Sequence, residues 1–369
     1  MRQPFCDYHI SAFLNAYEKG QKPLDLSLSE YLRAHKSIGA HDRRTIGETL
    51  FGMVRWRTLI DHFCPTDHVL DRLACYRSLN IEECRQDPSI PEPVRLGINE
   101  FLYNRLITSF GLEKTRSLCQ VLNGPAPTTI RVNLLKTTRD ELLKTWEGKF
   151  ELTPCQKAPA GIHFHKRAPL FTLPEFKAGL FEVQDEGSQL VAELVSAKPG
   201  EHVLDYCSGS GGKTLAFAPS MQGKGQIYLH DIRPWILLEA RKRLSRAGIQ
   251  NVQFNLPKKK MDWVLADVPC SGTGTLRRNP DAKWKIDAPM IERLVQQQRE
   301  IVAQALEHVK PGGHLVYATC SLLPEENQLQ VAYFLQTHSL KLEKELTLLP
   351  EEAGMDGFFA AVFKKETLL

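Results

Sequence analysis

The sequence predicts an α/β protein in which a mostly parallel sheet forms the C-terminal half, preceded by a small α+β module and an N-terminal helical domain. Three observations predict this architecture. From about residue 196 onward, short apolar runs typical of strands alternate with segments typical of helices, as in a parallel sheet covered on both faces. In the N-terminal third, apolar residues recur at helical spacing. Between these regions, proline and glycine interrupt the helical pattern.

The composition is typical of a globular chain that stays in solution. The 369 residues are enough for two or three domains, and 42% of them are hydrophobic and 24% charged. No apolar run approaches the ~18 to 20 residues of a membrane span, and the first residues lack the apolar stretch of a signal peptide. We therefore expect a monomeric cytoplasmic protein with no membrane partner.

The cysteines and the net charge restrict which kinds of site we expect in this chain. Nine cysteines without a C-x-x-C pair argue against a disulfide framework or a zinc site, so we expect reduced thiols and no metal. A net charge of +4 suits a polyanionic partner such as RNA. Many proteins that bind no nucleic acid are equally basic, so the charge alone decides nothing.

The N-terminal domain is predicted to span residues 1–120 and to be helical. Between Leu28 and Phe63 the apolar residues fall three or four positions apart, with polar residues between them. Four arginines decorate these helices, and they form either a solvated face or an RNA-facing patch. These arginines are Arg43, Arg44, Arg55 and Arg57.

The small α+β module is predicted over residues 121–195. Its start is marked by Asn123-Gly-Pro-Ala-Pro, which ends the helical pattern, and by Thr129-Ile-Arg-Val-Asn, which is typical of a short strand. Short strand signals then alternate with loops. We expect this module to take part in RNA recognition.

The parallel sheet is predicted within residues 196–369. In sheets of this kind, ligands bind beyond the carboxyl ends of the strands. Asp205, Asp231, Asp267 and Cys320 all stand at such ends, so four separate pieces of sequence should converge on one crevice.

The glycine turn Gly209-Ser-Gly-Gly-Lys-Thr follows the first of these strands. It is not a P-loop, because Cys207 stands where that motif has glycine, and it is not a dinucleotide fingerprint, because Thr214 stands where that motif has its third glycine. A nucleoside pocket remains, in which Asp231, 22 residues beyond Gly209, accepts both ribose hydroxyls. The alternative is a strand-to-helix turn with an incidental acidic cap.

Cys270 and Cys320 form the candidate reacting site. Either cysteine alone is more typical of a small buried hydrophobe, but both follow strands, and Asp267 places a carboxylate beside them. A thiolate can add to C6 of a pyrimidine and so prepare C5 to take a methyl group from a sulfonium donor. A second thiol suits the release of the adduct. The residues alone leave open which cysteine attacks.

Several motifs occur together in an order and spacing that resemble the RsmB/Sun (NOL/NSUN) family of RNA cytosine-5 methyltransferases over about residues 120–365. The resemblance implies a Rossmann-like class I methyltransferase domain, and the N-terminal part is similar to a NusB-like domain. The motifs are Asp205-x-Cys-x-x-x-Gly-Gly-Lys-Thr, Asp267-x-Pro-Cys-Ser-Gly, Arg278-Asn-Pro-Asp-Ala-Lys-Trp, Tyr317-Ala-Thr-Cys-Ser, Pro324-Glu-Glu-Asn and Val183-Gln-Asp-Glu-Gly-Ser.

The resemblance also implies the roles of individual residues. Cys320, in the Thr-Cys motif, would be the nucleophile, Cys270 would help to release the product, and Asp267 would lie between donor and base. The family usually places a carboxylate after the third strand to hold adenine; this chain has none there, and Asn255 is the candidate substitute. The residues implied to bind S-adenosyl-L-methionine are Cys207, Ser208, Gly209, Ser210, Gly211, Gly212, Lys213, Asp231, Asn255 and Asp267.

The expected function is methyl transfer from S-adenosyl-L-methionine to C5 of a cytidine in structured RNA, with small-subunit ribosomal RNA as first choice. Two alternatives stay open: the same chemistry on transfer RNA, and a non-catalytic RNA-binding or ribosome assembly factor. RNA contacts are expected mainly to phosphates and shape. The residues expected to make them are Arg131, Asn133, Arg277, Arg278 and Lys283.

Overall fold

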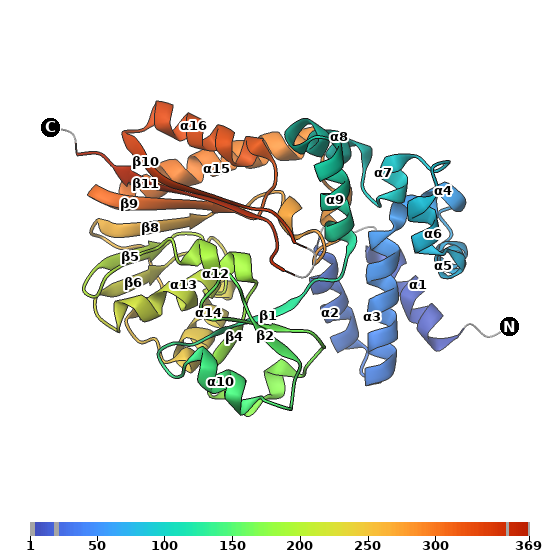
Figure 1. The fold of residues 1–369 in the computed structure, drawn as a ribbon, viewed down its shortest axis with the longest axis horizontal. Coiled ribbons are helices and arrows are strands. Elements are labelled where there is room, and N and C mark those ends of the chain that lie inside the picture. The colour runs from blue at the N-terminus through green and yellow to red at the C-terminus, as the bar shows by residue number, and fades with distance from the viewer. Residues whose placement is uncertain (1–3, 18–21, 352–353, 368–369) are drawn as a thin grey trace. The chain divides into compact units, whose positions relative to one another are not determined.

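The chain divides into two units, each assembled from separate stretches of sequence (Figure 1). The computed structural model describes residues 4–17, 22–351 and 354–367. One unit comprises Met1–Pro125 with Thr275–Ala288, and the other comprises Ala126–Gly274 with Pro289–Leu369. Among the described residues, no helix combines the length and the apolar character needed to cross a membrane.

The first unit is helical, as the apolar spacing predicts. Ile46, Leu50 and Met53 lie on one face of α3 and are buried in the core of this unit. Asn99 caps α8 by accepting the N–H of Leu102 at 2.7 Å. The helices are α1 (Phe5–Tyr17), α2 (Leu24–Ala34), α3 (Ala40–Arg55), α4 (Arg57–Phe63), α5 (Val69–Ser78), α6 (Ile81–Gln86), α7 (Glu92–Arg95), α8 (Glu100–Phe110) and α9 (Leu112–Asn123).

A late segment of the sequence, Thr275–Ala288, packs with these helices. The buried ammonium of Lys283 donates to the carbonyls of Arg55 at 2.8 Å and Gly97 at 2.6 Å, and to the side chain of Asn123 at 2.6 Å. The indole of Trp284 donates to the carbonyl of Val54 at 2.7 Å. The sequence analysis had assigned this segment to the C-terminal domain. The boundaries at residues 120 and 195 stay a prediction.

The second unit contains a small antiparallel sheet that agrees with the predicted α+β module. Its strand order is β2-β3-β1-β4, and Trp146 and Phe181 are buried against it together with Ile130. A capping box of Thr138 and Glu141 starts α10. The elements are β1 (Thr128–Val132), α10 (Arg139–Thr145), β2 (Leu152–Pro154), β3 (Gly161–Phe164), α11 (Pro174–Lys177) and β4 (Phe181–Val183).

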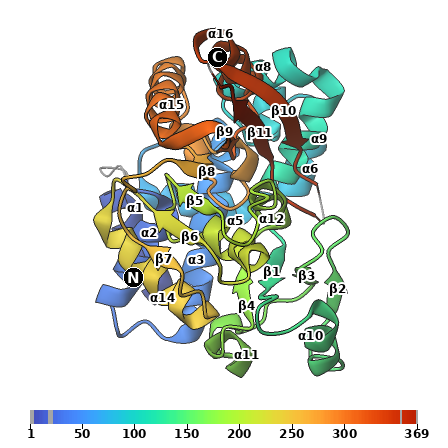
Figure 2. The ribbon, with the colours of Figure 1, turned by 90° about the vertical axis from the view of Figure 1, so that its left-hand side faces the viewer.

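A seven-stranded sheet of order β10-β11-β9-β8-β5-β6-β7 forms the rest of the second unit. The ladders from β9 to β7 are parallel, whereas β11 and β10 are antiparallel, which confirms the predicted mostly parallel sheet. In Figure 2, β9, β8, β5, β6 and β7 succeed one another in this order. The strands are β5 (His202–Asp205), β6 (Gln226–Leu229), β7 (Val252–Gln253), β8 (Met261–Asp267), β9 (Val309–Thr319), β10 (Leu340–Leu348) and β11 (Phe358–Lys365).

Helices cover both faces of this sheet (Figure 1). One face packs on α12 (Glu186–Ala192), α13 (Gly212–Phe217) and α14 (Pro234–Ala247), and the other packs on α15 (Ala288–His308) and α16 (Gln328–Thr337). Because β5, β8 and β9 are neighbours in the sheet, the loops at their carboxyl ends meet at one edge.

Candidate active site

The two cysteines singled out from the sequence lie side by side in the second unit. Cys270 follows β8 and Cys320 follows β9, and their sulfur atoms are 3.3 Å apart. The two loops are also joined through the main chain, since Val268 donates to the carbonyl of Ala318 at 3.0 Å and Gly274 to that of Cys320 at 2.9 Å. The predicted convergence of these two strand ends is therefore present in the structure.

The two thiols are not equivalent. The two thiols share a hydrogen bond, which lowers the pKa of Cys320, and the charge of Lys213 acts in the same direction. The same hydrogen bond, together with burial, raises the pKa of Cys270. The pair therefore loses its first proton from Cys320, and the thiolate is the nucleophilic form of cysteine.

Lys213 and Asp267 form an ion pair beside the cysteines. Burial lowers the pKa of Lys213, but the charge of Asp267 outweighs that effect and the pKa is raised overall. Lys213 therefore stays positively charged close to Cys320, where it favours the thiolate.

A buried carboxylate, that of Glu326, connects the two cysteine loops. It accepts the N–H of Ser271 at 2.9 Å and the hydroxyl of Ser271, the hydroxyl of Ser321 at 2.5 Å and the amide of Gln298 at 2.9 Å. Ser271 follows Cys270 in the chain and Ser321 follows Cys320. In the sequence, Glu326 stands in a family motif, and no role could be given to it. Its partners other than Ser321 lie 28 and 55 residues away along the chain, so that no local pattern points to them.

A cavity of about 900 Å³ opens next to the cysteine loops. Asp231 lies in its wall and accepts the N–H of Gly209 at 2.9 Å and the guanidinium of Arg233 at 2.9 Å. The residues that line this cavity include eight that were expected to bind the cofactor. These are Cys207, Ser208, Gly209, Ser210, Gly212, Lys213, Asp231 and Asp267.

The glycine turn before α13 needs glycine at two positions. Gly209 and Gly211 have φ angles of 51° and 77°, in the left-handed region that other residues rarely adopt. Gly211 lies behind the cavity wall rather than in it, with Ala240 3.4 Å from the position of a Cβ atom. Residues 208–210 of the turn line the cavity.

Asp205 forms the floor of the same cavity and is buried. Burial raises the pKa of Asp205 to about 7, although Thr214 donates a hydrogen bond to it at 2.6 Å. The second carboxylate oxygen of Asp205 has no hydrogen-bond partner among the described residues. Such a buried, unpartnered oxygen makes the ionised carboxylate costly, in agreement with the raised pKa of Asp205.

Asn255 does not take the place expected for it. Its side chain is exposed, donates to the carbonyl of the adjacent Leu256 at 3.0 Å and is absent from the lining of the cavity. The expectation that Asn255 holds adenine is therefore corrected. The structure instead brings an apolar side chain, Ile232, into the lining, and Ile232 is 87% exposed. The signal for it was its position directly after Asp231.

Four of the five residues expected to contact RNA are buried. The guanidinium of Arg131 donates to Gln184 and to the carbonyl of Gly212, and burial lowers its pKa to about 9. The amide of Asn133 donates at 2.8 Å to two main-chain carbonyls. Lys283 makes the buried hydrogen bonds to Arg55, Gly97 and Asn123. Arg277 is 2% exposed. We correct these four expectations, because a buried side chain cannot reach a phosphate; Arg278, half-buried, stays a prediction.

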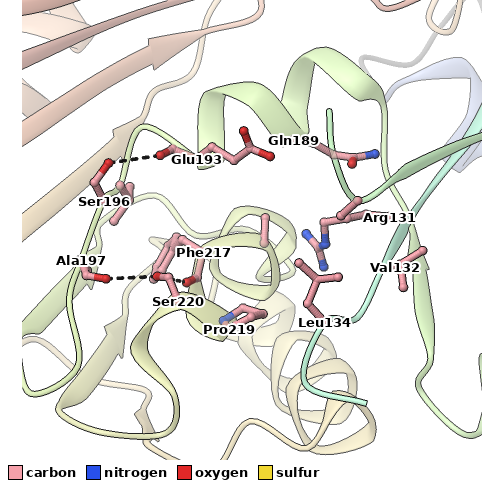
Figure 3. A pocket seen from close by; sticks show the side chains of 13 residues that line it. Arg131, Val132, Leu134, Gln189, Glu193, Ser196, Ala197, Phe217, Pro219 and Ser220 are labelled. Atoms are coloured by element: carbon pink, nitrogen blue, oxygen red, sulfur yellow. Dashed lines mark hydrogen bonds between the residues drawn. The ribbon is translucent and has the colours of Figure 1, made fainter. Parts of the chain in front are cut away.

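A second cavity, of about 510 Å³, lies elsewhere in the second unit (Figure 3). Arg131 and Glu193 line it, and burial raises the pKa of Glu193. The hydroxyl of Ser220 donates to the carbonyl of Ala197 at 3.1 Å and that of Ser196 to the carbonyl of Glu193 at 3.4 Å. Both hydroxyls therefore have hydrogen-bond acceptors within the wall of this cavity. The surface that lines the cavity is mainly apolar.

The chain is similar to proteins of known family. Residues 192–364 match the family model "16S rRNA methyltransferase RsmB/F", and residues 98–170 match "Methyltr_RsmF/B-like, ferredoxin-like domain". A Photorhabdus laumondii protein named "Ribosomal RNA small subunit methyltransferase B" is 34% identical over 287 residues, which are 72% of this chain and 66% of that protein. The chain thus spans less than two thirds of the length of the curated relatives it matches, for example 64% and 66% of two of them.

Two solved structures resemble this one. The structure of the protein PH0851 has a TM-score of 0.81, 24% identity and coverage of 99% of this chain and 100% of that chain, and it shows the shared fold. A "Methyltransferase Homolog Protein" from Pyrococcus horikoshii has a TM-score of 0.67, 28% identity and coverage of 76% and 99%. Together with the family model and the curated relatives, these findings show that the chain belongs to the RsmB/F methyltransferase family.

Proposed function

We propose that the chain transfers a methyl group from S-adenosyl-L-methionine to C5 of a cytidine in structured RNA, with small-subunit ribosomal RNA as its substrate. The observation that carries the proposal is the pair of sulfur atoms 3.3 Å apart, with Cys320 as the more acidic thiol, next to a cavity of about 900 Å³. The names of the family model and the curated relatives support the choice of RNA. A reaction on ribosomal RNA belongs in the cytoplasm.

The lining of the cavity fits the proposed donor. Asp231 has two oxygens that can accept ribose hydroxyls once Arg233 shares or yields its contact, and Gly209 holds the carboxylate in place. Ile232 offers apolar surface for the adenine ring, a role that Asn255 does not fill. The glycine turn, whose residues 208–210 line the cavity, suits the methionine end of the donor.

The chemistry proposed for Cys320 starts with the thiolate. Its sulfur forms a bond to C6 of the cytosine, and the electrons of the C5–C6 double bond then make C5 a nucleophile for the methyl group. The bond between the methyl group and the donor sulfur would break, which would leave S-adenosyl-L-homocysteine. After transfer, a proton acceptor removes the proton from C5 of the cytosine. The C5–C6 double bond then re-forms, and the bond between Cys320 and C6 breaks. Cys270, in contact with Cys320, assists this release, and the Lys213–Asp267 pair maintains the charge balance.

The experiment is a methylation assay with radiolabelled donor and purified small-subunit ribosomal RNA. We expect Cys320→Ala to abolish methyl transfer, and Cys270→Ala to leave RNA covalently attached to the protein on a denaturing gel. Cys84→Ala, a change at a half-buried thiol in the helical unit, should behave as the wild type. A covalent complex that forms in Cys320→Ala and not in Cys270→Ala would reverse the two roles.

Two further measurements separate this proposal from its alternatives. If transfer RNA is methylated and ribosomal RNA is not, the substrate assignment is wrong while the chemistry stands. Calorimetric titration with S-adenosyl-L-methionine should give measurable heat of binding, and the absence of binding would favour a non-catalytic RNA-binding role.

A further inference from the structure

Three side chains with metal-binding atoms meet in the second unit, in residues that the proposed reaction does not use. The sulfur of Cys155, a ring nitrogen of His163 and a carboxylate oxygen of Glu186 all lie within 4.8 Å of one another. Cys155 follows β2, His163 lies in β3, and Glu186 begins α12. Two strands of the small sheet and a helix beneath the large sheet thus contribute one side chain each.

The atoms that face the centre of this cluster are oriented by contacts on their far sides. One oxygen of Glu186 accepts the N–H groups of Lys157 at 2.8 Å and Ala158 at 3.0 Å, which leaves the other oxygen 3.2 Å from Nε2 of His163. The opposite ring nitrogen of His163 hydrogen-bonds the hydroxyl of Thr129 at 2.9 Å. Outer hydrogen bonds of this kind are what fix imidazole and carboxylate ligands around protein-bound metals.

The thiol of Cys155 is held against the main chain of Gly161. A Cβ atom at position 161 would lie 2.5 Å from the sulfur, so only glycine leaves room for the thiol in its present place. The N–H of Cys155 donates to the carbonyl of Gly161 at 3.0 Å, and Cys155 is 5% exposed. The position of the sulfur is therefore determined by the hairpin of β2 and β3.

We propose that Cys155, His163 and Glu186 bind one zinc ion, with water as the fourth ligand. Zinc takes thiolate, imidazole and carboxylate ligands in a tetrahedral arrangement. Bond lengths of about 2.3 Å to sulfur and about 2.0 Å to nitrogen or oxygen place such ligand atoms roughly 3.5 Å apart. The three atoms, within 4.8 Å of one another, must therefore move closer together when the ion binds, and binding displaces the proton of the thiol.

The zinc ion joins the β2–β3 hairpin to the start of α12. Residues on either side of Glu186, namely Gln184 and Ser188, line the cavity proposed for the donor. The zinc ion thereby cross-links the hairpin and the helix behind one wall of that cavity. The absence of C-x-x-C pairs had predicted no metal, but that pattern detects only sites whose ligands lie close together in sequence.

Cobalt substitution tests the site in the full-length protein. Co²⁺ added to metal-free protein should produce a sulfur-to-cobalt charge-transfer absorption, and Zn²⁺ should abolish it. The wild type should retain zinc in elemental analysis after dialysis and should unfold at a higher temperature with Zn²⁺ than without. We expect Cys155→Ser and His163→Gln to lose the absorption, the retained zinc and the thermal shift.

Matched variants keep the result interpretable. Cys320→Ser and Cys75→Ser should keep the absorption; they control for the two other places where neighbouring thiols lie together, the Cys270–Cys320 pair and the Cys64–Cys75 pair. Gly161→Ala, which displaces the Cys155 sulfur without removing it, should weaken cobalt binding if Cys155→Ser fails to fold. The proposal is overturned if the wild type retains no zinc and shows no absorption, or if the absorption survives in both Cys155→Ser and His163→Gln. None of these measurements depends on methyl transfer, so they leave the proposed function untouched.

Discussion

Glu326 accepts a hydrogen bond at 2.5 Å from the hydroxyl of Ser321, the residue that follows the proposed nucleophile. The same carboxylate accepts two hydrogen bonds from Ser271, the residue that follows Cys270. One side chain therefore joins two loops that belong to different strands, in addition to the main-chain hydrogen bonds between them. It helps to fix the position of each sulfur relative to the other.

Glu326→Gln should reduce methyl transfer by roughly 10- to 100-fold, because a displacement of about an ångström between reacting groups has effects of this size. The amide offers a single acceptor oxygen where the carboxylate offers two, so a serine loses its partner. Single-turnover methylation measures the loss. Glu325→Gln, at the half-buried neighbouring position, is the control and should have little effect. Equal losses in the two variants would contradict a special role for Glu326.

Removal of the Cys270 thiol should make Cys320 less acidic. The hydrogen bond with Cys270 lowers the pKa of Cys320, so its loss in Cys270→Ala raises that pKa towards the ordinary value of a thiol. The thiolate fraction of Cys320, and with it alkylation by iodoacetamide, should then rise at a higher pH than in the wild type. Mass spectrometry of the alkylated peptide across a pH series gives the midpoint. A midpoint that moves to lower pH would show that the hydrogen bond with Cys270 does not lower the pKa of Cys320.

Asp205 should make the protein less stable as the pH rises. Burial raises its pKa to about 7 from the ordinary 3.8, so the folded state binds this proton more tightly than the unfolded state. Its contribution to the free energy of unfolding is therefore full below about pH 4 and is lost between pH 4 and pH 7. In Asp205→Asn, the free energy of unfolding should change less between pH 4 and pH 7. Relative to the wild type, the variant should be stabilised more at pH 8 than at pH 5. Urea unfolding at a series of pH values tests this, and an unchanged slope in the variant would exclude it.

Gly211→Ala should weaken both the fold and donor binding. A φ angle of 77° costs an alanine about 1 to 2 kcal/mol, and Ala240 limits the room for the new methyl group. Thermal unfolding should show the loss, and calorimetry should show weaker binding of S-adenosyl-L-methionine because the turn relaxes. Gly39→Ala is the matched control, since Gly39 has a φ of −68° and open space around its Cβ position. Comparable effects at the two glycines would rule out backbone strain as the cause.

Lys283→Met should destabilise the helical unit rather than alter RNA contacts. The ammonium satisfies two buried carbonyls and the side-chain oxygen of Asn123, and the loss of these bonds costs roughly 3 kcal/mol. Denaturant unfolding measures the change. Arg278→Ala, in the same segment and half-buried, should weaken RNA binding. If Lys283→Met kept full stability and bound RNA more weakly, Lys283 would regain its expected role.

The sequence by itself determined the architecture and the edge of the sheet at which the proposed reacting residues lie. Hydrophobic periodicity distinguishes helices from buried parallel strands because it reflects which faces are covered, and strand ends are readable from turn residues. Asp231, Asp267, Cys270 and Cys320 could therefore be placed at one edge of a sheet before any coordinates were known. Asp231 and Asp267 line one cavity, and the two sulfurs lie beside it in contact.

Only the tertiary structure decided what lies around these groups. The partners of Lys283 are 160 to 228 residues away in the chain, and those of Arg131 are 53 and 81 residues away. The link from Glu326 to the Cys270 loop and the meeting of Cys155, His163 and Glu186 likewise depend on contacts between elements. Local patterns record the environment of a residue over one or two turns, whereas a buried charge is defined by whichever distant carbonyl or carboxylate the fold brings to it.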